Sequence, residues 1–421
     1  MHRDLDEQLR LMDEYSFRTV GPIMYEYTSW VLSEAVKRGY KRLYFLARDG
    51  YLLCGIANII CARRSIDIEC RYLYCSRYSL RMPSYHLIGE EAFDLLLLNG
   101  YYVTPKTVLL RAELDEAERS EIYKQLDISD ENAVFSDQGF GVFSDALRKN
   151  EFYRNIVTQR SKAAYKPAID YFRQEKLFEN DCIAIVDSGW TGSMQRSLRI
   201  LAESAGFGGK ITGFYFGMYT APKEPCDGEY LCFYFDRDTG LKRKIMFNNN
   251  LFECMLSAPH GMTLRYDDIN GVSKPIMAEY SEDDMHLLVE RQTAGALKFA
   301  EEQAEDAPYN LKRSLKTCYR LLKRAMIHPT AEEAEMYSRF MFCDDVTEGY
   351  HLSLADKEAK QAVRDNMLVP RVFRKLFRKK RPAGRKPLWV YGLIAGYPTL
   401  RRAWCRSNIL AWDMLKYMLK K

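Results

Sequence analysis

Two short polar segments, each placed where a hydrophobic run ends, contain the residues best suited to chemistry. The members of the first are Asp187, Ser188, Gly189, Trp190, Thr191, Gly192 and Ser193. Small residues let backbone N–H groups approach an anion, hydroxyls add donors, and the following helix N-terminus attracts negative charge. This pattern predicts a phosphate-binding loop, in which Asp187 accepts hydrogen bonds from sugar hydroxyls. A strand-to-helix turn capped by Thr191 or Ser193 is the structural alternative.

The second segment offers a cation beside a carboxylate. Its members are Arg48, Asp49 and Gly50. The planar guanidinium of Arg48 could bind pyrophosphate oxygens in pairs, while Asp49 could coordinate Mg²⁺ or act as a base. Arg77 and Arg81 follow the next apolar run and are placed for further pyrophosphate contacts. A helix-capping Asp49 and two solvated arginines are the alternatives.

The hydrophobic pattern around these segments alternates between helix and strand. Apolar residues at helical spacing cover the stretch 21–40, and short apolar runs follow, separated by further helical patterns. The runs expected to be strands are 42–47, 68–75, 182–187, 211–219 and 231–236. This order predicts an α/β fold built on a parallel sheet, and ligands of such sheets bind beyond the carboxyl ends of the strands.

The chain divides into three expected regions. Residues 1–275 form the α/β core, with an insertion of polar helices and loops at about 79–175, and residues 276–365 form a helical domain. Residues 366–421 contain fifteen Lys or Arg and a single acid, Asp413. Since the whole chain carries +5 and this segment +14, the remainder carries −9. An acidic body therefore precedes a basic amphipathic tail.

The tail has the composition of a membrane-binding segment. Its bases alternate with large apolar residues, and we expect Trp389 and Tyr391 to lie at a lipid interface and the tail to add little to any core. The apolar residues in question are Val372, Phe373, Leu376 and Phe377. The pattern favours an anionic membrane surface over nucleic acid. A last helical layer with a solvated basic face is the alternative.

Composition indicates the compartment. A hydrophobic share of 47% over 421 residues can fill one large core or two ordinary ones. No apolar window approaches the roughly 18 residues of a membrane-spanning helix, and the first residues are too charged for a signal peptide. The eleven cysteines are scattered and form no C-x-x-C pair. We expect a cytoplasmic protein, peripheral at the inner face of the plasma membrane.

The two polar segments resemble a known family. IAIVDSGWTGSMQRSL (183–198) resembles the substrate loop of phosphoribosyltransferases, with Ser188 in place of a second acid and Ser193 in place of a threonine. YFLARDGYLLCGIA (44–57) is similar to that family's pyrophosphate loop. Over roughly residues 20 to 265, the chain resembles the phosphoribosyltransferase module of bacterial surface-polysaccharide clusters, such as those for O-antigen or capsule. The resemblance implies a phosphoribosyltransferase-like fold.

The resemblance also implies a reaction. Ribose 5-phosphate passes from phosphoribosyl pyrophosphate to a hydroxyl of a lipid-linked glycan, and a partner phosphatase later removes the 5-phosphate to leave ribofuranose. Glycosyltransferases of the same pathway are further partners. Mg²⁺ and the arginines would stabilise the leaving pyrophosphate, and a base would take the proton of the acceptor hydroxyl. Our candidates for the base are Asp49, Glu253 and His260, of which Glu253 stands among apolar neighbours.

Two other functions compete with this transferase. The spacing of Asp236 and Asp238 is that of a haloacid-dehalogenase phosphatase, although Gly240 stands where that motif has threonine. A polar turn is the structural interpretation of the same residues. The third hypothesis is a non-catalytic module that docks a glycan-assembly complex at the membrane and binds no phosphoribosyl pyrophosphate.

Overall fold

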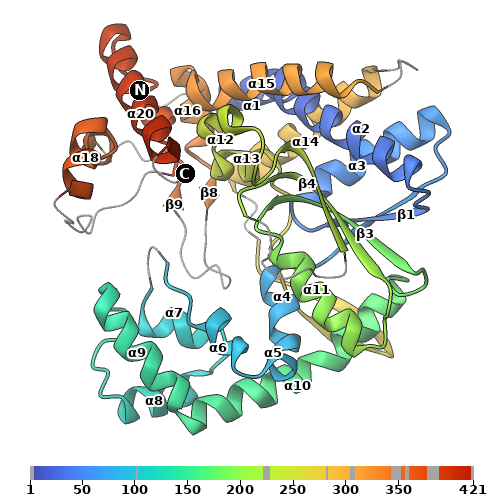
Figure 1. Cartoon of the computed structure of the whole chain (residues 1–421), viewed down its shortest axis with the longest axis vertical. Coiled ribbons are helices and arrows are strands. Elements are labelled where there is room, and N and C mark those ends of the chain that lie inside the picture. The colour runs from blue at the N-terminus through green and yellow to red at the C-terminus, as the bar shows by residue number, and fades with distance from the viewer. Residues whose placement is uncertain are drawn as a thin grey trace.

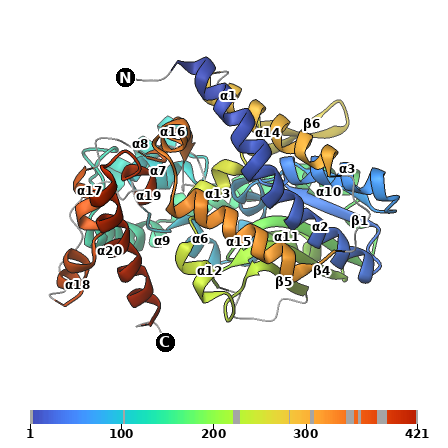
Figure 2. The ribbon, with the colours of Figure 1, turned by 90° about the horizontal axis from the view of Figure 1, so that it is seen from above.

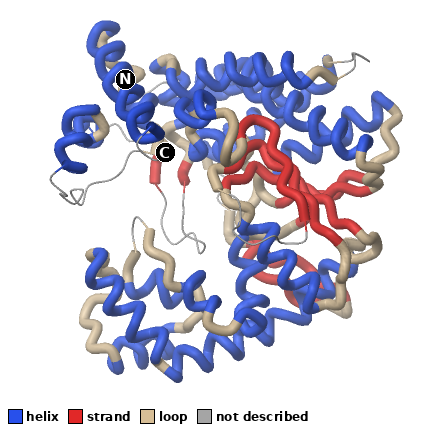
Figure 3. Tube along the Cα trace, viewed as in Figure 1, coloured by secondary structure: helices blue, strands red, loops and turns tan. Residues whose placement is uncertain are grey.

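The protein is described here by a computed structural model. It covers residues 4–100, 103–220, 228–280, 283–303, 309–342, 352–355, 360–376 and 388–418. Figure 1 shows a central sheet with helices on both sides and a separate group of helices connected to it. Figure 2 gives the view from above, and Figure 3 the distribution of helices and strands.

The central sheet has five strands, all parallel, in the order β2-β1-β3-β4-β5. The strands are β1 (Arg42–Leu46), β2 (Glu69–Leu73), β3 (Cys182–Trp190), β4 (Lys210–Met218) and β5 (Gly228–Phe235). Every one of them lies where the apolar runs predicted a strand. The α/β class with a parallel sheet, predicted from the sequence, is therefore confirmed.

Alternation of side chains gives the sheet two buried faces. Leu43 and Phe45 of β1 belong to one hydrophobic core, while Tyr44 and Leu46 belong to another on the opposite face. The first face is covered by α2 (Gly21–Lys37) and α3 (Gly50–Arg64), and the second by α10 (Glu151–Gln174) and α11 (Ser193–Ser204). Helices on both faces explain why the inner strands β1, β3 and β4 are mainly apolar.

A helical region between β2 and β3, here called the hood, has a hydrophobic core of its own. It occupies most of the predicted insertion. Its last helix, α10, contributes Tyr153 and Val157 to the hood core and Ala168 and Phe172 to the core beneath the sheet. The preceding elements are α4 (Arg77–Arg81), η2 (Met82–Ser84), α5 (Tyr85–Ile88), α6 (Glu91–Leu96), α7 (Pro105–Leu110), α8 (Glu116–Gln125) and α9 (Asp137–Lys149).

The helices beyond residue 283 pack on the N-terminal helices. Buried residues of α14 and α15, including Val289 and Leu322, share one hydrophobic core with α2, α3 and the sheet. The hydrophobic core is thus continuous across the predicted boundary near residue 275. The elements concerned are α1 (Leu5–Tyr15), η1 (Ser16–Val20), α14 (Asp284–Glu302), α15 (Leu311–Ile327), α16 (Ala331–Tyr337), β8 (Met341–Phe342), β9 (Leu352–Ser353) and α17 (Lys360–Asp365). Along the chain, β5 and α14 are separated by α12 (Leu241–Met246), α13 (Asn249–Met255) and the hairpin of β6 (Thr263–Ile269) and β7 (Val272–Met277).

The last segment is partly core, which corrects the expectation that it adds little to one. Trp389 is 1% exposed and donates its indole N–H to the carbonyl oxygen of Met326 at 2.9 Å, and Tyr391 is buried as well. These two aromatic residues are therefore core residues and not interfacial ones. Phe373 of α18 is exposed, as predicted, and Phe377 lies outside the described residues. The elements are α18 (Leu368–Leu376), α19 (Val390–Leu393) and α20 (Thr399–Met418).

In the part of the chain that the structure describes, no helix has the length and apolar character needed to cross a bilayer.

Candidate functional site

The predicted site residues gather at the carboxyl edge of the sheet. In the strand order β2-β1-β3-β4-β5, the chain turns in opposite directions from β1 and β3, and folds of this kind bind ligands beyond the carboxyl ends of two such neighbouring strands, a place called the crevice below. Asp49 follows β1, and Asp187 lies in β3 beside it. Sheet order thus places the two polar segments of the sequence at the position where ligands of such folds bind.

Asp49 faces β3 and does not cap its own helix. The residue precedes α3, yet its carboxylate makes no capping bond and instead accepts a hydrogen bond from the Ser188 hydroxyl. Burial raises the pKa of Asp49, and the Ser188 bond with the charges of Arg48 and Arg77 opposes this rise. Gly50 allows α3 to start tightly against β1, because a side chain there would meet Phe45 at 2.6 Å.

The predicted phosphate loop is mostly strand, which corrects the sequence interpretation. β3 continues through Trp190, with Gly189 and Trp190 paired to Gly217 and Met218 of β4. Gly189 has φ +129°, and a Cβ there would lie 2.0 Å from the Gly217 carbonyl oxygen, so this pairing requires glycine.

What is left of the loop is a short link to α11. Only Thr191 and Gly192 separate β3 from that helix, which starts at Ser193 and has no side-chain cap. Gly192 takes the left-handed φ of +70°. Neither Thr191 nor Ser193 caps α11, so the sequence alternative of a hydroxyl-capped turn is wrong too.

Asp187, the predicted acceptor of sugar hydroxyls, is buried. It is 8% exposed, and its pKa is raised well above the ordinary range by burial, and further by the charges of Asp49 and Glu253. The backbone N–H groups of Ser188 and Gly189 partly offset this rise. Asp187 is therefore one of three mutually repelling carboxyl groups.

Glu253 of α13 is the third carboxyl group. The indole N–H of Trp190 donates to its Oε1 at 2.6 Å, so Trp190 orients a carboxylate and does not belong to a phosphate loop. Burial, and next the charge of Asp49, raise the pKa of Glu253 to about 7, against the Trp190 bond and the charges of Arg77 and Arg48. A carboxyl group with this pKa exchanges a proton near neutral pH.

The arginines divide into two groups. Arg48 and Arg77 are exposed, and their charges act on both Asp49 and Glu253. Arg81 is 6% exposed, and burial lowers its pKa; Tyr85 opposes this effect, while the charges of Arg77 and Arg111 lower the pKa further. Arg48 and Arg77 thus belong to the crevice, while Arg81 faces the hood.

His260 is held in one tautomer by its neighbours. Nδ1 lies 2.8 Å from the Gly261 carbonyl oxygen and must donate to it, so the neutral ring accepts at Nε2 the hydroxyl of Tyr72, 2.7 Å away. Burial lowers the pKa of His260, and Arg48 lowers it further. Because its acceptor nitrogen is occupied, His260 is a weaker base candidate than Glu253.

Tyrosines around His260 were missed from the sequence. Tyr51, Tyr72 and Tyr74 place their rings within 6.0 Å of the imidazole, measured between centroids. Tyr72 and Tyr74 are two residues apart at the end of β2, and side chains at this spacing in a strand lie on the same face. The YLY pattern could therefore have indicated that the two rings share a surface.

The residues present fit a partial magnesium site. Among the described residues there is no cluster of three or more His, Cys, Asp or Glu side chains able to hold a metal by themselves. Mg²⁺ in proteins is commonly held by one or two carboxylates together with water and substrate phosphates. Asp49 and Asp187, whose pKa values are raised first of all by burial, are hard oxygen donors of the right kind.

The phosphatase-like pair lies in a polar turn after β5. The carboxylate of Asp236 accepts hydrogen bonds from the backbone N–H groups of Asp238 and Thr239 and from the Thr239 hydroxyl, which together lower its pKa against the effect of burial. A nucleophilic aspartate needs free oxygens, so this geometry favours the turn interpretation.

The chain was compared with models of protein families and with curated proteins, and neither comparison found a match.

Proposed function

We propose that the crevice binds a magnesium complex of phosphoribosyl pyrophosphate and transfers its ribose 5-phosphate to a sugar hydroxyl of a bacterial polysaccharide. The observation that carries the proposal is the meeting of three carboxyl groups with raised pKa values, Asp49, Asp187 and Glu253, with two arginines at the edge of a parallel sheet. The proposal retains the phosphoribosyltransferase-like fold implied by resemblance.

A metal–diphosphate ligand matches both halves of this charge pattern. Arg48 and Arg77 present guanidinium groups that pair with pyrophosphate oxygens, which carry growing charge as the bond to ribose breaks. Asp49 and Asp187 supply oxygens to the metal, whose positive charge would favour their ionised forms. When bound, Mg²⁺ would stabilise the leaving pyrophosphate. The uncapped N–H groups of α11 remain for the 5-phosphate.

Glu253 is the base of the proposed reaction. Its pKa of about 7 is near the working pH, where a group can be ionised yet still hold a proton well, and Trp190 fixes one of its oxygens. The other oxygen can take the proton from the attacking acceptor hydroxyl. The rings of Tyr51, Tyr72 and Tyr74 provide an apolar wall of the kind that lines ligand sites.

Isothermal titration with phosphoribosyl pyrophosphate and Mg²⁺, followed by mass spectrometry of glycan acceptors, tests this function. Arg77→Gln should weaken binding, whereas Glu253→Gln should bind and fail to transfer. Arg320→Gln, an exposed arginine of α15, is the matched control for lost charge. Binding without an adduct on any acceptor would leave a docking module, and release of inorganic phosphate from a phosphomonoester would indicate the phosphatase. No binding at all would refute the transferase.

We further propose that the protein works at the inner face of the plasma membrane beside the phosphatase and glycosyltransferases of its pathway. With Trp389 buried, the large apolar side chains exposed on the described parts of α18 and α20 are Val369, Phe373, Leu400, Trp404 and Met414. Flotation with anionic vesicles at low and high salt tests this, using Phe373→Ser/Trp404→Ser against the wild type. Equal flotation would contradict it.

A further inference from the structure

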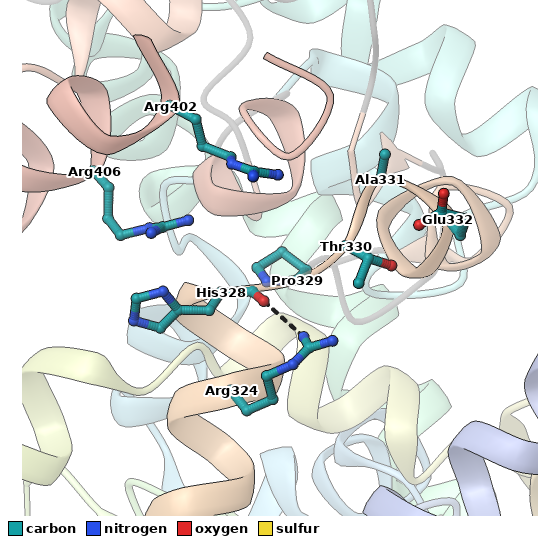
Figure 4. A pocket seen from close by; sticks show the side chains of 8 residues that line it. All are labelled: Arg324, His328, Pro329, Thr330, Ala331, Glu332, Arg402 and Arg406. Carbon is teal, nitrogen blue, oxygen red and sulfur yellow. Dashed lines mark hydrogen bonds between the residues drawn. The ribbon is translucent and has the colours of Figure 1, made fainter. Parts of the chain in front are cut away.

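A second polar cavity lies far along the chain from the crevice residues. It has a volume of about 490 Å³ and is formed where α15 ends, α16 begins and α20 passes (Figure 4). Its lining includes Arg324 and His328 from the end of α15 and Arg402 and Arg406 from α20. This volume is in the range of sites for small organic ligands.

The positive charge of this cavity comes mainly from α20. Arg324 is neutralised by Glu333, which contacts both of its terminal nitrogens at 2.8 and 2.9 Å. Arg402 and Arg406, four residues apart on one helix face, form no ion pair among the described residues. Figure 4 shows both guanidinium groups extending from α20 toward His328 and Pro329. Against them, the lining contains one acid, Glu332.

Part of this charge is buried without compensation. Arg402 donates to the Ala395 carbonyl oxygen at 2.8 Å, but the Nε of Arg406 is buried and has no hydrogen-bond partner. Burial, and then Arg402, lower the pKa of Arg406. Burial also lowers the pKa of His328, as do Arg406, Lys323 and Arg324, which favours the neutral ring with its one N–H donor. A buried donor left unpaired costs free energy that an anion would recover.

We propose that this cavity is a second binding site, which takes the phosphate or diphosphate group of a phosphorylated ligand through Arg402 and Arg406. Guanidinium groups pair with phosphate oxygens bidentately, and the remaining volume accommodates the organic part of the ligand. The ligand is either a free phosphorylated metabolite or a phosphate headgroup of a lipid. The inference does not rest on the proposed transfer, which uses other residues.

Titration of the full chain with inorganic pyrophosphate in the presence of EDTA tests the site. Arg402→Gln/Arg406→Gln should weaken one binding component by about ten-fold or more, the usual effect of losing charge-assisted bonds. Lys316→Gln/Arg320→Gln removes the same charge from the exposed face of α15 and should leave that component unchanged. Arg77→Gln would alter only a component that belongs to the crevice, so the two sites can fail separately.

A second arm identifies the source of the phosphate. Co-sedimentation with phosphatidylcholine vesicles, with and without phosphatidic acid, is measured for the same variants. Loss of pyrophosphate binding in the cavity variant but not in the control assigns the site to free phosphate. Loss of binding to phosphatidic acid vesicles in the cavity variant alone assigns it to lipid phosphate. If melting shows that the double variant is unfolded, Arg406→Gln alone replaces it, because its Nε has no partner to lose. Wild-type behaviour of the cavity variant in both arms would overturn the proposal.

Discussion

Replacing Glu253 by glutamine should make the protein more stable, and increasingly so as the pH rises. The pKa of Glu253 is raised from 4.5 in the unfolded chain to about 7 in the native protein. Between these two values the unfolded chain releases a proton that the native protein keeps, so the free energy of unfolding falls by up to about 1.4 kcal/mol per pH unit. Integrating this difference gives a cost of about 1 kcal/mol at pH 5 and about 3 kcal/mol at pH 8.

Glutamine removes this cost but can still accept the Trp190 indole N–H. Urea unfolding at pH 5 and pH 8 should therefore show Glu253→Gln gaining about 2 kcal/mol more over the wild type at pH 8 than at pH 5.

Glu131→Gln is the control of opposite sign. Its side-chain bonds with Lys106 and Tyr123 lower the pKa of Glu131, so stability from ionised Glu131 is already present above pH 4.5 and is lost only in acid. Its substitution should destabilise similarly at both pH values. A Glu253→Gln gain that does not grow with pH would refute the assignment of Glu253 as a desolvated carboxyl group.

Three further predictions concern residues that shape the site or the core. Trp190→Phe removes the hydrogen bond that lowers the pKa of Glu253, so the acid limb of the pH–rate profile for transfer should move to higher pH; an unmoved limb would contradict the contact. Gly189→Ala should destabilise by about 3 kcal/mol or more, because its Cβ would meet the Gly217 carbonyl oxygen, and urea unfolding against Gly208→Ala, which has open space around it, checks this. Trp389→Ala should lower the free energy of unfolding by about 3–5 kcal/mol in the same measurement, and a value within error of the wild type would contradict the burial of this side chain.

The sheet could be predicted from the sequence because its signal is local. Each strand is a short apolar run bounded by polar residues, and β3 at 182–190 was missed only at its end, where Ser188, Gly189 and Trp190 look like a loop in isolation. Their extended conformation depends on pairing with Gly217 and Met218 of β4, which no local pattern contains. Strand ends are therefore decided by tertiary partners.

The site could be predicted as a set of residues but not as a set of roles. Order along the chain placed Asp49 and Asp187 near one another, since parallel strands bring their carboxyl ends together. Glu253 was predicted only as a base among apolar neighbours, and helix α13 brings it to the other two. Burial decided the remainder. A sequence does not reveal that Asp187 is 8% exposed, or that the indole of Trp190 turns toward a glutamate 63 residues away. The burial of Trp389 was wrongly predicted for the same reason. Basic residues nearby in the sequence do not determine whether a tryptophan side chain is buried in the folded protein.

Helix α10 has a consequence for how the molecule opens. A single helix of 24 residues carries side chains of the hood core at one end and of the sheet core at the other. Helical hydrogen bonds are cooperative, so fraying at one end raises the free energy of the next turn. Pro167 lies between these two ends and has no backbone N–H to donate, so the ladder of hydrogen bonds is interrupted there, and the hood end and the sheet end of α10 should exchange their amide hydrogens as separate units of local unfolding. Heat or denaturant that loosens the hood would then leave the part of α10 that packs beneath the sheet in place.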